Sequence, residues 1–160
     1  MKYDIKLKND ADIKILRESG KRLAKVLQAV AKEVKPGVTT GYLNDFVYKM
    51  ITDMGDKPAF LNYQPFGADY PYPGSICISV NDEVVHGIGG DRVLKEGDIV
   101  GLDGGVTHKG MISDSAITVP VGNISKEDEE LMRVTKEALM AGIHAAVGGK
   151  YVNDISKAIE

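Results

Sequence analysis

Hydrophobic residues recur every three or four positions in two stretches near the start of the chain, which is the spacing of helices with one buried face. The first stretch covers residues 10–34 and has Asp10 as a candidate N-cap. Its apolar face consists of Ile13, Leu16, Gly20, Leu23, Leu27, Val30 and Val34. The second stretch covers residues 40–54, with Thr39 or Thr40 as its N-cap. The pattern therefore predicts two amphipathic helices in succession.

The helical spacing is lost in the middle of the chain. Residues 59–74 are rich in proline and aromatic residues, which predicts a long loop. Segments that are rich in β-branched residues and bounded by turn residues follow, and we predict that they are strands. These segments are Ser75–Val80, Glu83–His86, Asp98–Leu102 and Met111–Val121.

Helical spacing returns at Ser125, which begins a sequence that resembles a capping box. The expected buried stripe of this third helix is Leu131, Val134, Ala138, Leu139 and Ile143. A fourth helix is expected to begin near Asn153, in a pentapeptide that echoes the start of the second helix at Tyr42. We therefore expect an α+β fold in which helices cover an antiparallel sheet, as one incomplete domain over residues 1–160. Residues 10–121 would form a first helix–helix–strands unit, and residues 125–160 would begin a second unit.

Composition narrows the class of protein. Hydrophobic residues make up 43% of the chain and charged residues 27%, which is typical of a globular domain rather than a disordered one. The net charge of −3 predicts no direct binding of nucleic acid or of an anionic membrane. No apolar run is long enough for a membrane span, and the single cysteine fits a reducing compartment. We expect a cytoplasmic protein.

Asp103 and Asp114 are the strongest chemical signal in the sequence. If Thr107-His108-Lys109-Gly110 forms a hairpin turn centred between His108 and Lys109, the two aspartates lie directly opposite each other, with Cβ atoms roughly 5 Å apart. Such a pair needs a proton, a basic partner or a cation, and a divalent metal such as Mn²⁺, Fe²⁺, Co²⁺ or Zn²⁺ suits the oxygen ligands. The alternative is a register shifted by one or two residues, in which both aspartates are solvated surface groups.

Two other side chains near this hairpin have both a structural and a functional interpretation. His86 follows an apolar segment and precedes a glycine, so it is either a packing residue or an acid–base group that faces the carboxylates. Cys77 lies in an alternating segment, which favours a small apolar wall residue over a reactive thiol.

Several motifs in order resemble the N-terminal part of a type I methionine aminopeptidase, a metallopeptidase with the pita-bread fold. They are Ile15–Gly20, Val34–Thr40, Pro58–Tyr63, Ser75–Ile88, Gly97–Val100, Asp103, Asp114–Ala116 and Val134–Leu139. The resemblance covers nearly the whole chain and implies metal-dependent removal of the N-terminal methionine from nascent proteins, with the ribosome as a further candidate partner.

The resemblance also implies roles for individual residues. Asp103 and Asp114 would be metal ligands in a site for two divalent metal ions. His86 would be the catalytic histidine that contacts the substrate. The methionine pocket would be lined by Phe60, Tyr63 and Cys77, since an unbranched thioether suits an apolar, aromatic and sulfur-lined slot.

The sequence also departs from the pattern of this family. Tyr63 and Cys77 are further apart than usual, which predicts an insertion within Gln64–Gly74 beside the pocket. In addition, the chain ends before the region that supplies the remaining histidine and two glutamates in the family. The alternatives left open are a non-catalytic half-length paralogue that binds peptide, ribosome or a partner protein, and a site completed by self-association or by a separate second half. A related enzyme that cleaves before proline is a further alternative.

Overall fold

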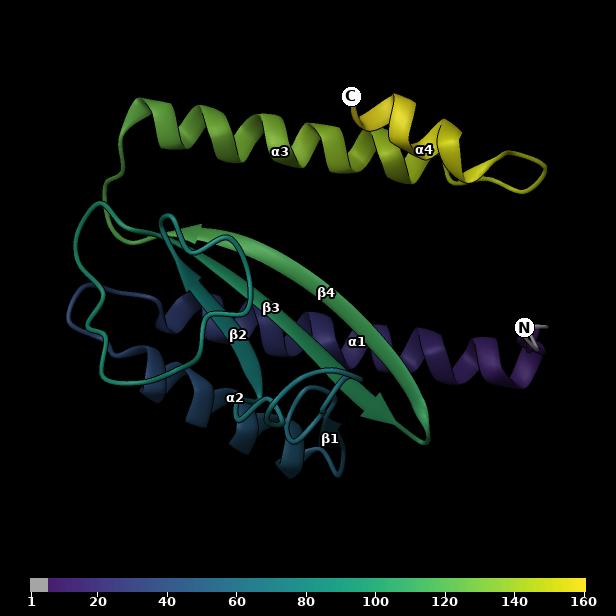
Figure 1. The fold of residues 1–160 in the computed structure, drawn as a ribbon, viewed down its shortest axis with the longest axis horizontal. Helices are drawn as coiled ribbons and strands as arrows, with labels where there is room; N and C mark the ends of the chain where they lie inside the picture. The colour runs from purple at the N-terminus through teal and green to yellow at the C-terminus, as the bar shows by residue number, and fades with distance from the viewer. Residues whose placement is uncertain (1–5) are drawn as a thin grey trace. The chain divides into compact units, whose positions relative to one another are not determined.

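The computed structural model describes residues 6–160, which form two compact units, one up to Asn123 and one over Ile124–Glu160 (Figure 1). The first unit contains two helices and a four-stranded sheet. Its elements are α1 (Asp10–Glu33), α2 (Thr40–Asp53), β1 (Lys57–Pro58), β2 (Ile76–Val80), β3 (Ile99–His108) and β4 (Met111–Pro120). This confirms the predicted α+β class.

The two N-terminal helices occupy nearly the predicted ranges. The N-cap of α1 is Asn9 and not the predicted Asp10, because the Asn9 side chain accepts hydrogen bonds from the backbone N–H groups of Ala11 and Asp12. Asp12 in turn accepts from the Asn9 N–H, which completes a capping box. Of the two predicted candidates Thr39 and Thr40, Thr39 caps α2, since its hydroxyl accepts from the N–H of Tyr42.

The sheet is antiparallel throughout, with β3 at its centre. β4 pairs along one edge of β3, and β2 and β1 share the other edge. Side chains alternate between the faces of a strand, so the even-numbered residues of β3 point to one face, where Val100, Leu102 and Val106 are fully buried. On this face α1 packs against β3 and β4, whereas α2 packs against β1 and β2. The helices contribute Leu23, Val26, Leu27, Val30, Leu43, Val47 and Ile51 to the core.

Three predicted features of the strands are wrong. Glu83–His86 is not a strand, because Asn81 and His86 adopt left-handed backbone conformations with φ of 58° and 61°, which an extended strand does not allow. β3 continues well beyond the predicted end at Leu102. β1 was not predicted, since two residues are too short to show a periodic pattern.

The register of the β3–β4 hairpin also differs from the prediction. His108 pairs with Met111, so the turn consists of Lys109 and Gly110 and not of the predicted four residues. Both turn residues have positive φ, 48° and 81°, which is the two-residue type I′ geometry that matches the twist of the strands. The pairing is shifted by two residues, and Asp114 therefore lies opposite Gly105 rather than Asp103.

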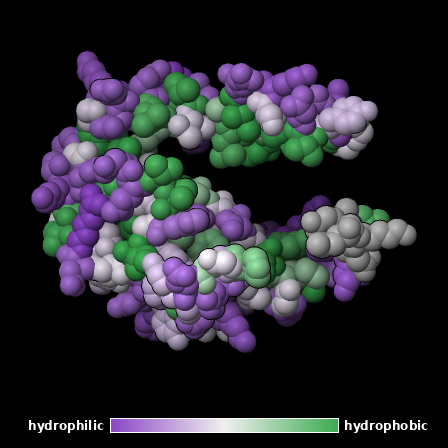
Figure 2. All heavy atoms as spheres, in the orientation of Figure 1, coloured by the Kyte–Doolittle hydropathy of each residue, from purple (hydrophilic) through white to green (hydrophobic). Residues whose placement is uncertain are grey.

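The second unit consists of α3 (Lys126–Ala145) and α4 (Val152–Ile159), which pack together near Gly142. Ser125 caps α3 as predicted, because its hydroxyl accepts from the N–H of Asp128. The predicted buried stripe on α3 is wrong, since only Gly142 is buried along the helix and Leu131, Val134, Leu139 and Ile143 are about half exposed. A single eight-residue helix covers little of α3, and the hydrophobic residues gather along one side of this unit (Figure 2).

None of the helices in residues 6–160 combines the length and the hydrophobicity that crossing a membrane requires.

Candidate active site

The sheet face opposite the core carries the acidic pair and the cysteine. Cys77 on β2 lies directly opposite Asp103 on β3, and Asp114 on β4 lies opposite Gly105. Because residues paired across a ladder share a face, and Asp103 and Gly105 are two residues apart, all three side chains emerge on the same face. The shifted register therefore places the two aspartates diagonally and keeps them neighbours.

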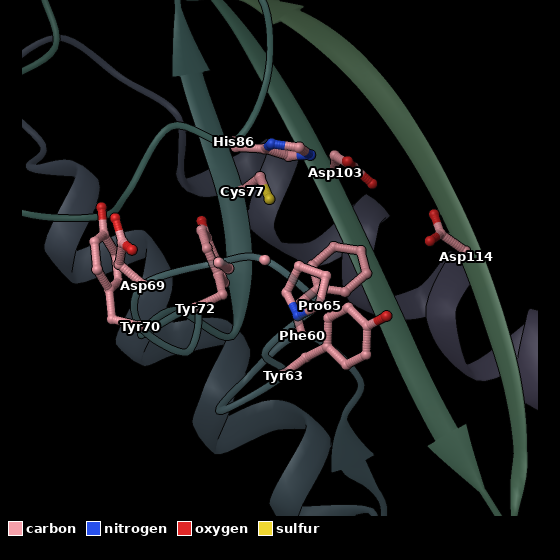
Figure 3. Close-up of a pocket in the computed structure, with 12 residues that line it drawn as sticks. Phe60, Tyr63, Pro65, Asp69, Tyr70, Tyr72, Cys77, His86, Asp103 and Asp114 are labelled. Carbon is pink, nitrogen blue, oxygen red and sulfur yellow. The ribbon is translucent and has the colours of Figure 1, made fainter.

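These side chains line a cavity of about 530 Å³, which is the size range of small-molecule sites. The six site residues predicted from the sequence all line it: Phe60, Tyr63, Cys77, His86, Asp103 and Asp114. In Figure 3 the Asp103 carboxylate extends from β3 toward Asp114, whereas His86 and Cys77 lie on the other side of Asp103. The structure thus brings together residues that are up to 54 positions apart in the sequence, from Phe60 to Asp114.

The two carboxylates have no basic partner in the part of the chain that the structure describes, since no ion pair includes Asp103 or Asp114. Partial burial raises the pKa of Asp103, the nearby charge of Asp114 raises it further, and His86 acts in the opposite direction. Such a pair of oxygen donors, with no ion-pair partner among the described residues, fits a hard divalent cation. Within residues 6–160 no group of three or more His, Cys, Asp and Glu side chains is arranged so that it could hold a metal ion, and the two aspartates alone do not make a complete metal site.

His86 reaches the cavity from a tight turn and not from a strand end. Its φ of 61° is in the left-handed region, where a residue other than glycine is strained. A Cβ on the next residue, Gly87, would collide with the carbonyl group of Ile78, so only glycine lets this turn lie against β2. The turn brings the His86 imidazole next to Asp103 and Cys77 (Figure 3).

The wall of the cavity is apolar and aromatic. Cys77 is buried, and burial raises the pKa of its thiol. A hydrogen bond with Tyr72 lowers this pKa, whereas the charges of Asp103 and Asp114 raise it, and the pKa is raised overall. A thiol in this state stays neutral and acts as a small hydrophobic group. Phe60 approaches the sheet over Gly105, where a Cβ would lie only 3.0 Å from the Phe60 ring.

The loop between Tyr63 and Cys77 supplies residues that we did not predict for the site. Pro65, Gly67, Ala68, Asp69, Tyr70 and Tyr72 also line the cavity. Two backbone hydrogen bonds of 2.8 Å close the base of this loop, from the Asn62 N–H to the Tyr72 carbonyl and from the Tyr72 N–H to the Tyr63 carbonyl. The unusual spacing of Tyr63 and Cys77 indicates a changed loop here, but spacing alone does not indicate which of its side chains turn inward.

The chain is similar to known proteins over nearly its whole length. Residues 14–160 match the family described as metallopeptidase family M24. The chain belongs to metallopeptidase family M24. Methionine aminopeptidase from Aquifex aeolicus is 46% identical to this M24 chain over 156 residues, which are 97% of the chain and 60% of that protein. Methionine aminopeptidase 1 from Bacillus subtilis is 42% identical over 153 residues, 96% of the chain and 59% of that protein.

A solved structure shows the same fold for the M24 chain. The crystal structure of methionine aminopeptidase from Rickettsia prowazekii matches with a TM-score of 0.91 at 38% identity, and the match covers 97% of this chain and 60% of that one. The M24 chain therefore has the fold of the matched part of the Rickettsia prowazekii structure. It spans about 60% of the length of the aminopeptidases that it matches.

Proposed function

We propose that this M24 chain carries the methionine pocket and two metal ligands of a methionine aminopeptidase, an enzyme that removes the first residue of new proteins. The observation that carries the proposal is the convergence of the diagonal aspartates, His86 and an apolar wall on one cavity. The similarity to proteins named methionine aminopeptidase supports the substrate and the reaction class.

In this proposal Asp103 and Asp114 contribute oxygen ligands to a site for two divalent metal ions, from among Mn²⁺, Fe²⁺, Co²⁺ and Zn²⁺. A bound divalent ion acts as a Lewis acid and makes a nucleophile available from water at neutral pH. Two carboxylates are fewer ligands than a catalytic metal site usually has, so the proposal includes further ligands from water or from a second copy of this chain.

The remaining residues bind and orient the substrate. Phe60, Tyr63 and Cys77 receive the methionine side chain, since a flexible thioether packs well against aromatic rings and sulfur. His86, in the same cavity, forms a hydrogen bond to the first peptide group and stabilises the charge that develops on its oxygen. The substrates would be nascent proteins in the cytoplasm.

The experiment that tests this proposal measures the release of methionine from a Met-Ala-Ser peptide with Mn²⁺ or Co²⁺ and with EDTA. The site variant is the double substitution Asp103→Asn, Asp114→Asn. The matched control is Asp82→Asn, Asp91→Asn, which removes the same charge from two exposed positions outside the cavity.

We expect metal-dependent release that the control variant retains and the site variant loses. A Leu-Ala-Ser peptide should be cleaved much more slowly, because the branched leucine side chain fits the slot poorly. The proposal would be contradicted by equal release from the two double variants, or by no release from the folded chain with any of these metals.

A further inference from the structure

Three hydrogen bonds hold the turn that carries His86 in place, two of them to β2. The Ile78 N–H donates to the Gly87 carbonyl at 2.8 Å, and the Gly87 N–H donates to the Ser79 hydroxyl at 3.1 Å. The third bond comes from outside β2, since the Tyr72 hydroxyl donates to the Gly87 carbonyl at 2.9 Å. A residue in a strained conformation, such as His86, keeps it only when its surroundings hold it there.

Tyr72 is well placed to hold this turn. Its hydroxyl also lies 3.2 Å from the Ile76 carbonyl, so its single proton is shared between two carbonyl oxygens. Burial raises the pKa of Tyr72, and the Cys77 thiol beside it acts in the same direction. The phenol therefore stays protonated and remains a hydrogen-bond donor at neutral pH.

The backbone of Tyr72 is fixed as well. Its N–H and its carbonyl form the two hydrogen bonds that close the base of the loop over residues 62–72. The side chain extends from this base along the cavity toward Cys77 and His86 (Figure 3). Tyr72 therefore connects the loop that forms one wall of the cavity to the turn that carries the histidine.

We infer that Tyr72 is a positioning residue for His86: its hydroxyl holds the Gly87 carbonyl and thereby fixes the imidazole in the cavity beside Asp103. The effect of this positioning on catalysis rests on the proposed function. The positioning of His86 itself is a property of the folded chain. The two can therefore be tested separately.

The test of positioning uses NMR of the histidine rings in the full chain, which has only three histidines. Tyr72→Phe removes the hydroxyl and keeps the ring in the wall. We expect the His86 ring signal, assigned with a His86→Asn variant, to shift or broaden in Tyr72→Phe while the signals of His108 and His144 stay in place.

The matched control is Tyr48→Phe, which removes a hydroxyl from an exposed tyrosine on α2 that does not line the cavity. It should leave all three ring signals unchanged. An unshifted His86 signal in folded Tyr72→Phe would overturn the inference, as would an equal shift in Tyr48→Phe.

If Tyr72→Phe fails to fold, the exchange of the Tyr72 hydroxyl proton in the wild-type chain tests the positioning role instead. A hydroxyl proton held by carbonyl groups exchanges slowly with water, so the Tyr72 Cζ carbon should give two signals in an equal mixture of H₂O and D₂O. A single averaged signal would overturn the inference.

Activity gives an independent readout. Under the conditions that release methionine, Tyr72→Phe should lower kcat by about tenfold with little change in KM, because the pocket wall is retained and only the placement of His86 is lost. A raised KM with unchanged kcat would instead show that Tyr72 is only a wall residue. If the wild-type chain releases no methionine, the proposed function fails, whereas the NMR result still decides the positioning role.

Discussion

Asp114 on β4 lies opposite Gly105 on β3, so it meets Asp103 along the diagonal of the ladder and not across it. Diagonal neighbours on one face are about 7 Å apart, which leaves more room between the carboxylates than a direct pair has. Glycine at position 105 has no side chain on this face, and Ala59 and Phe60 lie over it instead. The two carboxyl groups nevertheless interact, since Asp114 raises the pKa of Asp103 through its charge and through a side-chain hydrogen bond.

Gly105 should tolerate a side chain less well than its neighbour Gly104. A Cβ at position 105 would lie 2.9 Å from the Ala59 Cβ, whereas at position 104 the nearest atom is 3.6 Å away. We expect Gly105→Ala to lower the free energy of unfolding by about 1–2 kcal/mol, because the segment that carries Phe60 must move. Gly104→Ala should be neutral or slightly stabilising. Urea unfolding of both variants checks this, and equal loss in the two would contradict it.

His86 should matter for chemistry more than for stability. Asparagine adopts the left-handed conformation of this position more readily than most residues, so His86→Asn should change the free energy of unfolding by less than about 0.5 kcal/mol. Loss of the imidazole should lower methionine release by about 100-fold. Thermal unfolding and the peptide assay, made on the same preparation, separate the two effects. A variant that unfolds easily would show that His86 is a packing residue.

Asp56 should contribute strongly to stability, although it lies outside the cavity. Its buried carboxylate accepts from Arg22 at 3.1 Å and lies 2.7 Å from Nδ1 of His108, which joins α1 to the end of β3. We expect Asp56→Asn to lower the free energy of unfolding by about 2 kcal/mol, since bonds to a buried charge are lost. Asp53→Asn is the control, because its pair with Lys49 is exposed. Similar unfolding midpoints for the two variants would argue against this role.

Asp98 should make the stability of the chain depend on pH in the acid range. Partial burial raises the pKa of Asp98. Hydrogen bonds from the Asn81 amide and the Lys95 N–H lower it, as do the charges of Arg92 and Lys95. These effects outweigh burial, and the pKa is lowered overall. A lowered pKa in the folded state means that Asp98 stabilises the fold above its unfolded pKa, and that this contribution is lost as the pH falls through the folded pKa. Asp98→Asn should therefore be less stable than wild type at pH 7, with the difference shrinking toward pH 2. A pH-independent difference would contradict this assignment.

The helices could be predicted well from the sequence because their signals are local. The apolar spacing from Leu23 to Val30 and the caps at Thr39 and Ser125 depend only on nearby residues. The stripe on α3 followed the same rule and was wrong about burial, because periodicity shows which side of a helix is apolar and not what covers it.

The strands and the site were harder to predict because they depend on distant partners. The hairpin register depends on which residues have positive φ, and Lys109 gives no strong signal for that conformation. Asp103, Asp114, His86, Cys77, Phe60 and Tyr63 were predicted as site residues with help from a family resemblance, and the structure brings all six to one cavity. Tyr72 was missed, since its importance comes from a hydrogen bond to a carbonyl fifteen residues away.

The most direct test of the account is a titration of the full chain with Mn²⁺, followed by electron paramagnetic resonance of the free ion. It asks whether the diagonal aspartates bind a metal, and it does not depend on turnover. We expect wild type and the Asp82→Asn, Asp91→Asn control to bind Mn²⁺ alike, and the Asp103→Asn, Asp114→Asn variant to lose at least about 90% of the binding at the same concentrations. Identical isotherms for all three chains would contradict the proposed metal site and, with it, the aminopeptidase function proposed for this cavity.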